Sequence, residues 1–337
     1  MKKLISILIM FLSLAVTVRA ILPAGNKPSE LKVMTWNIWG RMNLDQRYTI
    51  NGKTGRERVI EIIRESGADI ITMTETYGSA KDIAHALGFY YYTPSKDANL
   101  TIFSRYPIED YGKMKRLPPF SFIVATVKLP GGGKVRVYNI WLTSSGRHIA
   151  EIKNKELSDE EFVEGDNNRY ENIMQLLEHP SFQKDLDNSE HVPVIVAGDF
   201  NCVSHLDYTP ETKARGLNFL RILPEKTSMA MLDAGFTDSY RAVHPEVTKE
   251  TLGYTWNTVG LGFTYEVGKG FVPVDKDKNP QPGHRGLFAR IDFIYSAGNK
   301  LKPVASETIS HFPGVTGRCF PEFPSDHAAV LTTFKLK

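Results

Sequence analysis

The sequence predicts an α/β protein with mixed β-sheets, built as one domain. Short apolar strands alternate with amphipathic helices along most of the 337 residues. Several neighbouring strands are joined by short turns, which indicates antiparallel hairpins within the same sheets. No repeat, low-complexity tract or linker divides the chain between residues 31 and 337. We therefore expect one domain over 31–337.

The strands and helices are predicted from hydrophobic periodicity and from the residues that end each segment. Gly67 and Gly88 follow two amphipathic stretches and are expected to end helices. The Pro-Gly turn at 130–133 joins two strands into a hairpin. Strands are expected at 31–39, 69–76, 89–94, 99–108, 121–129, 134–142, 192–201, 289–296 and 326–336, and helices at 55–66, 79–88, around 170–177 and at 227–243.

The first 20 residues have the layout of a secretory signal peptide. Lys2 and Lys3 precede an apolar run, and Val18 and Ala20 are small residues at the positions that a signal peptidase reads. The run is about fifteen residues long, whereas a membrane-spanning helix needs roughly 20. We expect a signal peptide at 1–20, a linker at 21–30, no transmembrane segment in the mature chain and a secreted or periplasmic protein.

The formal charge of +3 lies in this predicted signal. The chain has 41 Lys and Arg residues against 38 Asp and Glu, and residues 1–20 contain three of the former and none of the latter. The mature chain is therefore formally neutral. It lacks the overall positive charge that is typical of nucleic-acid-binding proteins, so net charge does not favour nucleic acid as a partner. Nothing in the sequence indicates an oligomeric state.

Polar residues end several of the predicted apolar strands. In α/β sheets, ligands bind beyond strand ends. Carboxylates, amides and one imidazole are suitable ligands for a hard divalent cation such as Mg²⁺. The two cysteines are too few for a thiolate zinc site. The polar residues are Asn37, Glu75, Asp199, Asn201, Asp292, Asp326 and His327.

Each of these residues also has a purely structural explanation. Asn37 could cap a turn and Glu75 could cap the following helix. Asp199 to Asn201 could form an Asx turn, Asp326 could be the N-cap of a strand-entry loop, and His327 could be an ordinary half-buried histidine. The order of the polar clusters along the chain, rather than any one of them, carries the functional prediction.

Six short motifs give the chain a resemblance to a known superfamily. TWNIW, TET, SRYPI, GDFN, RIDFIY and SDH, in this order, resemble the endonuclease/exonuclease/phosphatase superfamily over Leu31 to Leu336. The resemblance implies a four-layer α/β sandwich, with two mixed β-sheets packed face to face and helices outside. It also implies hydrolysis of a phosphodiester or phosphomonoester by in-line attack of an activated water, with Mg²⁺, or alternatively Mn²⁺, as cofactor.

The same resemblance assigns the metal ligands. Glu75 would be the principal ligand of the cation, with Asn37 beside it and Asp326 at the edge of the metal site. These are oxygen donors, as a hard cation requires.

The remaining polar residues are implied to act on the phosphate and the attacking water. Asp199 would orient or deprotonate the water, and Asn201 would donate its amide to a phosphate oxygen. His327 would contact the scissile phosphate while Asp292 accepts its other ring N–H, which fixes the tautomer. Either His327 or Asp199 could be the base.

The sequence departs from the family pattern at Trp141. Many members carry a histidine there as general acid, but an indole cannot protonate a leaving group. With Gly146 and Arg147 after it, Trp141 is similar to the arrangement in apurinic/apyrimidinic endonucleases, so Trp141 and Arg147 are predicted to bind substrate, as is Trp256. The alternatives are that both tryptophans are packing residues, that Arg147 is a solvated charge, and that His148 is the acid.

Two cysteines lie in loops that should converge on the site. Cys202 follows Asn201, and Cys319 precedes Asp326 by seven residues. In a secreted protein a Cys202–Cys319 disulfide is a reasonable hypothesis, and two free thiols are the alternative.

The leading functional hypothesis is a secreted metal-dependent phosphoesterase. Its substrate could be nucleic acid, a phospholipid, a small phosphate ester or a glycan-linked phosphodiester. The competing hypothesis is a non-catalytic binding protein that keeps the fold, and Trp141 is the residue that supports it.

Overall fold

The computed structural model describes residues 28–40, 49–50, 52–111, 114, 117–146, 149–257, 263–266, 270–273, 288–310, 318, 320 and 323–337. The predicted signal peptide and most of the linker at 21–30 lie outside the described residues, as do Arg147, His148 and Cys319. Among the described residues, none of the helices has the length and hydrophobicity needed to cross a membrane.

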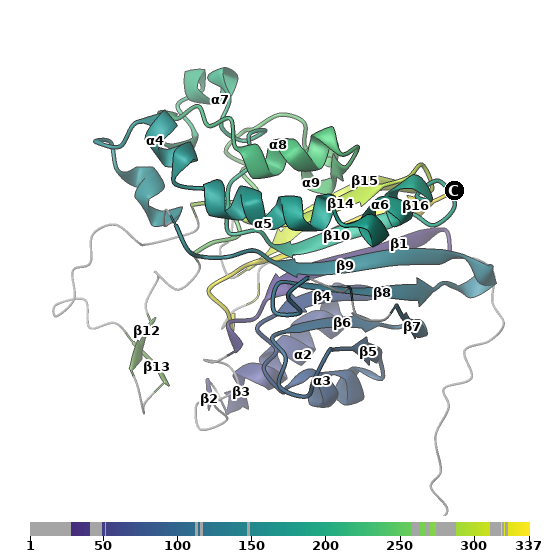
Figure 1. Cartoon of the computed structure of the whole chain (residues 1–337). Coiled ribbons are helices and arrows are strands. Elements are labelled where there is room, and N and C mark those ends of the chain that lie inside the picture. Colours follow the sequence, from purple (N-terminus) through teal and green to yellow (C-terminus); the bar gives the residue numbers. More distant parts are fainter. Residues whose placement is uncertain are drawn as a thin grey trace, which may run out of the picture.

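Two six-stranded mixed sheets form the centre of the molecule (Figure 1). This confirms the predicted fold class. In spatial order, the first sheet contains β15 (Leu301–Ile309), β16 (Ala329–Leu336), β1 (Glu30–Asn37), β4 (Ile70–Thr74), β6 (Leu100–Ser104) and β5 (Tyr90–Tyr92). The second sheet contains β11 (Thr237–Asp238), β14 (Asp292–Ala297), β10 (Val194–Asp199), β9 (Lys134–Trp141), β8 (Phe122–Lys128) and β7 (Ile108–Asp110).

Helices cover the outer face of each sheet. On the first sheet these are α2 (Gly55–Ser66) and α3 (Ala80–Leu87), and on the second they are α5 (Asn167–Leu177), α6 (Pro180–Asp187) and α8 (Lys226–Asp233) (Figure 1). The remaining elements are two small hairpins, β2 (Thr49–Ile50) with β3 (Lys53–Thr54) and β12 (Phe263–Glu266) with β13 (Gly270–Pro273), the helices α4 (Asp159–Glu164), α7 (Pro210–Ala214) and α9 (Ser239–Val243), and the 3₁₀ turns Pro130–Gly132, Ile149–Lys153 and Asn218–Leu220.

Local signals set the ends of the helices. Thr54 and Glu57 form a capping box at the start of α2, and Gly67 ends that helix with a φ of 70°. The predicted helix 55–66 is confirmed. The predicted helix 227–243 is wrong, because the chain turns at Gly235, with a φ of 85°, and forms α8, the short strand β11 and α9.

Alternation along the strands divides the side chains between two kinds of layer. In β1, Leu31 and Val33 face the second sheet and join the core between the sheets. Met34 and Trp36 face α2 and α3 on the other side. By the same alternation, Asn37 lies on the same face of β1 as Leu31 and Val33. The apolar layer between the sheets therefore becomes polar at this end of β1.

A fully buried ionic cluster lies beside the start of β14. The guanidinium of Arg290 donates to both carboxylate oxygens of Asp207, at 2.9 and 3.0 Å, and to Asp238 at 2.8 Å. Arg241 donates to Asp207 at 2.6 Å. Burying charges is tolerated here because each is paired by charge-assisted hydrogen bonds. The cluster fixes the backbone two residues before Asp292.

We predict that Arg290→Met lowers the free energy of unfolding by about 3–5 kcal/mol, because it leaves carboxylates buried with too few partners. Urea unfolding measures this change. The control is Lys128→Met, which removes an exposed partner of Glu109 and should cost less than about 1 kcal/mol. Similar small losses for both variants would contradict the role given to the cluster.

Candidate phosphoesterase site

The pairing of β10 with β14 brings two of the predicted site residues together, and β1 adds a third. In the second sheet, Asp199 at the end of β10 lies opposite Asp292 at the start of β14. Each lies two residues along its strand from a side chain in the core between the sheets, Ala197 for Asp199 and Ile294 for Asp292. Because side chains alternate along a strand, both carboxylates also point between the sheets. From the first sheet, Asn37 Nδ2 donates to Asp199 Oδ2 at 3.0 Å. The site lies where the two sheets meet at this end.

His327 completes the group. Its Nδ1 lies 2.9 Å from Asp292 Oδ2, as the sequence predicted. Its Nε2 lies 3.9 Å from Asp199 Oδ2 and also 3.9 Å from Asp326 Oδ1. Ligand atoms of Asp199, Asp292 and His327 all fall within 4.8 Å of one another. The hydrogen bond to Asp292 leaves Nε2 as the ring atom that faces the remaining carboxylates.

Glu75 and Asn201 adopt left-handed backbone conformations beside this group. Glu75 follows β4 with a φ of 63°, and Asn201 follows β10 with a φ of 53°. Since Asn37 pairs with Thr74, Glu75 comes next to Asn37 at the same end of the sheet. A Cβ at Gly40 would lie 1.5 Å from the carbonyl oxygen of Glu75, so only glycine allows this approach.

The side-chain amides of Asn201 and Asn37 hydrogen-bond to protein groups. Asn201 Nδ2 donates to the Leu142 carbonyl at 2.9 Å, and its backbone N–H donates to Asp199 Oδ1 at 2.9 Å. Asn37 Oδ1 accepts from the Trp39 N–H at 3.0 Å. Both amides thus hold the loops that carry the carboxylates, and Asn201 keeps one amide hydrogen beyond its bond to Leu142.

Burial and charge change the acidity of the central groups. Burial, together with the nearby Asp292, raises the pKa of Asp199 to about 7. Burial also raises the pKa of Asp326. For His327, burial opposes protonation, but the carboxylates of Asp292, Asp326 and Asp199 outweigh it and raise the pKa well above its usual range. Such shifted values are typical of functional sites.

The two predicted tryptophans flank the group on different sides. Trp141 lies opposite Asp199 across β9 and β10 and is half-buried against the core between the sheets. Trp256 bridges to His327 in the backbone ladder, and its Nε1 donates to Asp326 Oδ2 at 3.3 Å. Of the predicted substrate-binding residues, Arg147 lies outside the described residues.

Sequence reasoning missed several residues that hold the site together. Thr255 Oγ1 accepts from the N–H groups of Ile291 and Asp292, and its carbonyl accepts from Ala328, so it joins the segments of Asp292 and His327. Ser325 Oγ donates to the Asn37 carbonyl at 2.6 Å and accepts from the His327 N–H. Ser325 stands in the SDH motif but had no predicted role, because its contact with Asn37 joins distant parts of the chain, as the contacts of Thr255 with Ile291 and Asp292 do.

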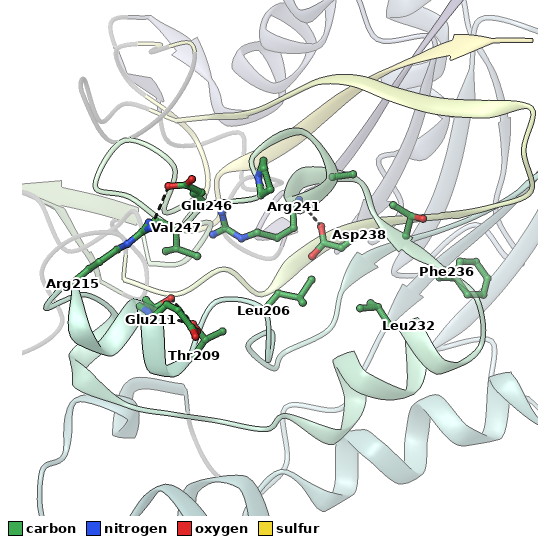
Figure 2. A pocket seen from close by; sticks show the side chains of 14 residues that line it. Leu206, Thr209, Glu211, Arg215, Leu232, Phe236, Asp238, Arg241, Glu246 and Val247 are labelled. Atoms are coloured by element: carbon green, nitrogen blue, oxygen red, sulfur yellow. Dashed lines mark hydrogen bonds and ion pairs between the residues drawn. The ribbon is translucent and has the colours of Figure 1, made fainter.

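A cavity of about 590 Å³ opens elsewhere, among α7, α8 and α9 (Figure 2). None of the predicted site residues lines it. Its charged side chains pair with each other or with neighbours, as Arg215 does with Glu246 at 3.2 Å. The convergence of titratable groups, rather than cavity size, therefore identifies the candidate site.

Comparisons with known proteins agree with this arrangement. A model of the Endonuclease/Exonuclease/phosphatase family matches residues 34–327. An uncharacterized Caenorhabditis elegans protein is 24% identical, over 90% of this chain and 91% of its own length. D. rerio TDP2 complexed with single strand DNA product is 17% identical with a TM-score of 0.53, over 91% of this chain and 99% of that one. An AP endonuclease from Archaeoglobus fulgidus is 19% identical with a TM-score of 0.50, over 91% and 100%.

Cys202 does not face the site. It is 1% exposed and packs into the core between the second sheet and its helices. The structure has it as a free cysteine, so the proposed disulfide with Cys319 is wrong for this structure. Burial, with the nearby Asp166 and Glu225, raises the pKa of the thiol well above its usual range.

We predict that the Cys202 thiol does not react with Ellman's reagent in the native protein, because it is both inaccessible and protonated. The measurement uses a Cys319→Ser variant, so that Cys202 is the one remaining thiol. One equivalent should react after unfolding in guanidinium. Rapid reaction before unfolding would contradict the burial of this residue.

Proposed function

Because the chain belongs to the endonuclease/exonuclease/phosphatase family, we propose that it is a metal-dependent phosphoesterase acting by in-line attack of an activated water on a phosphate ester. The convergence of Asn37, Asp199, Asp292 and His327 in one buried group carries this proposal. Phosphate ester hydrolysis needs charge neutralisation at the phosphoryl oxygens and a base for the water, and this group contains residues suited to both.

The donor set fits a hard divalent cation, which we take to be Mg²⁺, with Mn²⁺ as the alternative. Asp326 Oδ1 is buried without a hydrogen-bond partner, as an available ligand atom would be. The family resemblance assigns the cation to Glu75, Asn37 and Asp326, while the ligand atoms of Asp199, Asp292 and His327, which lie within 4.8 Å of one another, are the second group that could hold it. When bound, the cation would offset negative charge on the phosphoryl group.

The protein's own residues would position the phosphate and move the proton. His327, held at Nδ1 by Asp292, would donate from Nε2 to a phosphoryl oxygen. Asp199 lies beside this nitrogen and would take the proton of the attacking water. Asn201 would donate its remaining amide hydrogen to the phosphate. This proposal makes Asp199 the base, a choice that the sequence left open between His327 and Asp199.

We expect Mg²⁺-dependent hydrolysis in a panel of plasmid DNA, an abasic oligonucleotide, sphingomyelin, inositol phosphates and bis-p-nitrophenyl phosphate. EDTA should abolish it, and His327→Ala should lower kcat/KM by at least about 100-fold, as expected for loss of a group that acts in the transition state. The matched control is His85→Ala, an exposed histidine of α3, which should retain wild-type turnover.

Two outcomes would contradict the proposal. Wild-type turnover by His327→Ala on every cleaved substrate would exclude the role of this residue. No hydrolysis of any substrate by the wild-type protein would favour the non-catalytic binding protein, for which Trp141 in place of a general acid is the supporting observation.

We also propose that the protein is exported, to the periplasm or outside the cell. The sequence of residues 1–20 supports this. Intact mass and N-terminal sequencing should show a mature chain that begins at Ile21, in the extracellular or periplasmic fraction. Leu12→Arg, which charges the apolar run, should leave the full-length chain inside the cell. A wild-type chain that keeps Met1 and stays in the cytoplasm would overturn the proposal.

A further inference from the structure

At the end of the second sheet that carries Asp199 and Asp292, which we call the acidic group, the neighbouring strand β9 ends in an aromatic residue. Asp292, Asp199 and Trp141 lie opposite one another in the registers of β14, β10 and β9. Since residues paired in register point to the same face of a sheet, the Trp141 indole faces the space between the sheets, as Asp199 does. Across these three strands, two carboxylates are therefore followed by an indole on the same face of the sheet.

A second aromatic ring extends this row toward solvent. Phe120 stacks on Trp141, with ring centroids 5.3 Å apart and an interplanar angle of 24°. Phe120 is 58% exposed although it is a large apolar side chain. Trp141 is itself packed against the core between the sheets. The outer ring therefore rests on a fixed support while most of its surface is open to solvent.

The backbone of Phe120 is held from both sheets. Buried Asn99 donates to the Phe120 carbonyl at 2.7 Å, and the Asn99 carbonyl accepts from Thr76, the residue after Glu75. On the other side, the Trp141 N–H donates to the Ser121 carbonyl at 2.9 Å. The exposed ring is thus anchored between the loop that carries Glu75 and the strand beside Asp199.

We propose that Phe120, supported by Trp141, is a stacking platform for a planar aromatic ring that the substrate carries near its scissile phosphate. An exposed aromatic side chain held rigidly loses little entropy on binding, and aromatic faces stack with nucleobases and other planar rings. The ring's source is either a base joined through a sugar or an aryl group joined directly to the phosphate. This inference rests on the proposed function, because it needs the phosphate to bind at the adjacent acidic group.

Calorimetric titration of the full mature protein tests the platform without depending on turnover. Thymidine 5′-monophosphate, phenyl phosphate and deoxyribose 5-phosphate are compared with Ca²⁺ present. The wild-type protein should bind at least one ring-bearing ligand roughly five- to tenfold more tightly than deoxyribose 5-phosphate. A gain for thymidine 5′-monophosphate alone identifies a base, and a gain that includes phenyl phosphate identifies a ring next to the phosphate.

Variants separate stacking from simple hydrophobic contact. Phe120→Leu keeps an apolar side chain without a π face and should bring the affinity ratio close to one, whereas Phe120→Tyr should preserve it. Tyr90→Ala is the matched control, because Tyr90 is 50% exposed and pairs with Ser104, at the end of β6 away from the site. Thermal unfolding confirms that each variant is folded.

Equal affinities of the wild-type protein for all three ligands would overturn the platform. So would a Phe120→Leu variant that keeps the wild-type ratio of affinities between the ring-bearing ligand and deoxyribose 5-phosphate. The proposed function is tested separately by the hydrolysis panel. Hydrolysis without ring-dependent binding would reject the platform alone. Ring-dependent binding that Phe120→Leu removes, in a protein that hydrolyses nothing, would reject the enzyme and keep the platform.

Discussion

The register of β10 within the second sheet is the constraint on which the site depends. Asp199 lies between Trp141 on one neighbour and Asp292 on the other, and all three point between the sheets. A slip of β10 by one residue would turn Asp199 toward the helices and bring the residues next to it in β10 inward. The same register places Ile195 and Ala197 in the core between the sheets. Core and site therefore have one cause, the alternation of side chains along paired strands.

Burying an acidic group at the end of this core requires compensation. Asp199 and Asp292 are almost fully buried, and burying a carboxylate without hydrogen-bond partners is costly. Asn37, at the end of β1, and His327, two residues before β16, supply these partners. Deeper in the structure, Arg290 is tied to two carboxylates, two residues before β14 begins. The ionic cluster thus fixes the backbone that leads into Asp292.

The sequence predicted most of the strands because hydrophobic periodicity is a local property, but it missed β15 and joined β6 and β7, which lie in different sheets, into one strand. It also placed Asn37 and Asp199 at strand ends, and the structure brings them within hydrogen-bonding distance. It could not predict Thr255, whose contacts with Asp292 and Ala328 join distant segments. The Cys202 hypothesis failed because nearness along the chain to Asn201 does not fix direction. After β10 the chain turns through a left-handed residue, and Cys202 points to the helices.

Trp141 links the chemistry of the site to the choice of substrate. The position beside Asp199 has no group that can protonate a leaving oxygen, and Phe120 covers its outer side. With Trp141 at this position, the leaving oxygen would be stabilised by the cation, would belong to an ester whose leaving group is stable as an anion, or would take its proton from His148, which lies outside the described residues. Replacing an acid with a ring removes one catalytic group and adds a binding surface at the same place. Binding energy from a ring at this position would fix the ester against the acidic group, which offsets part of the loss through orientation.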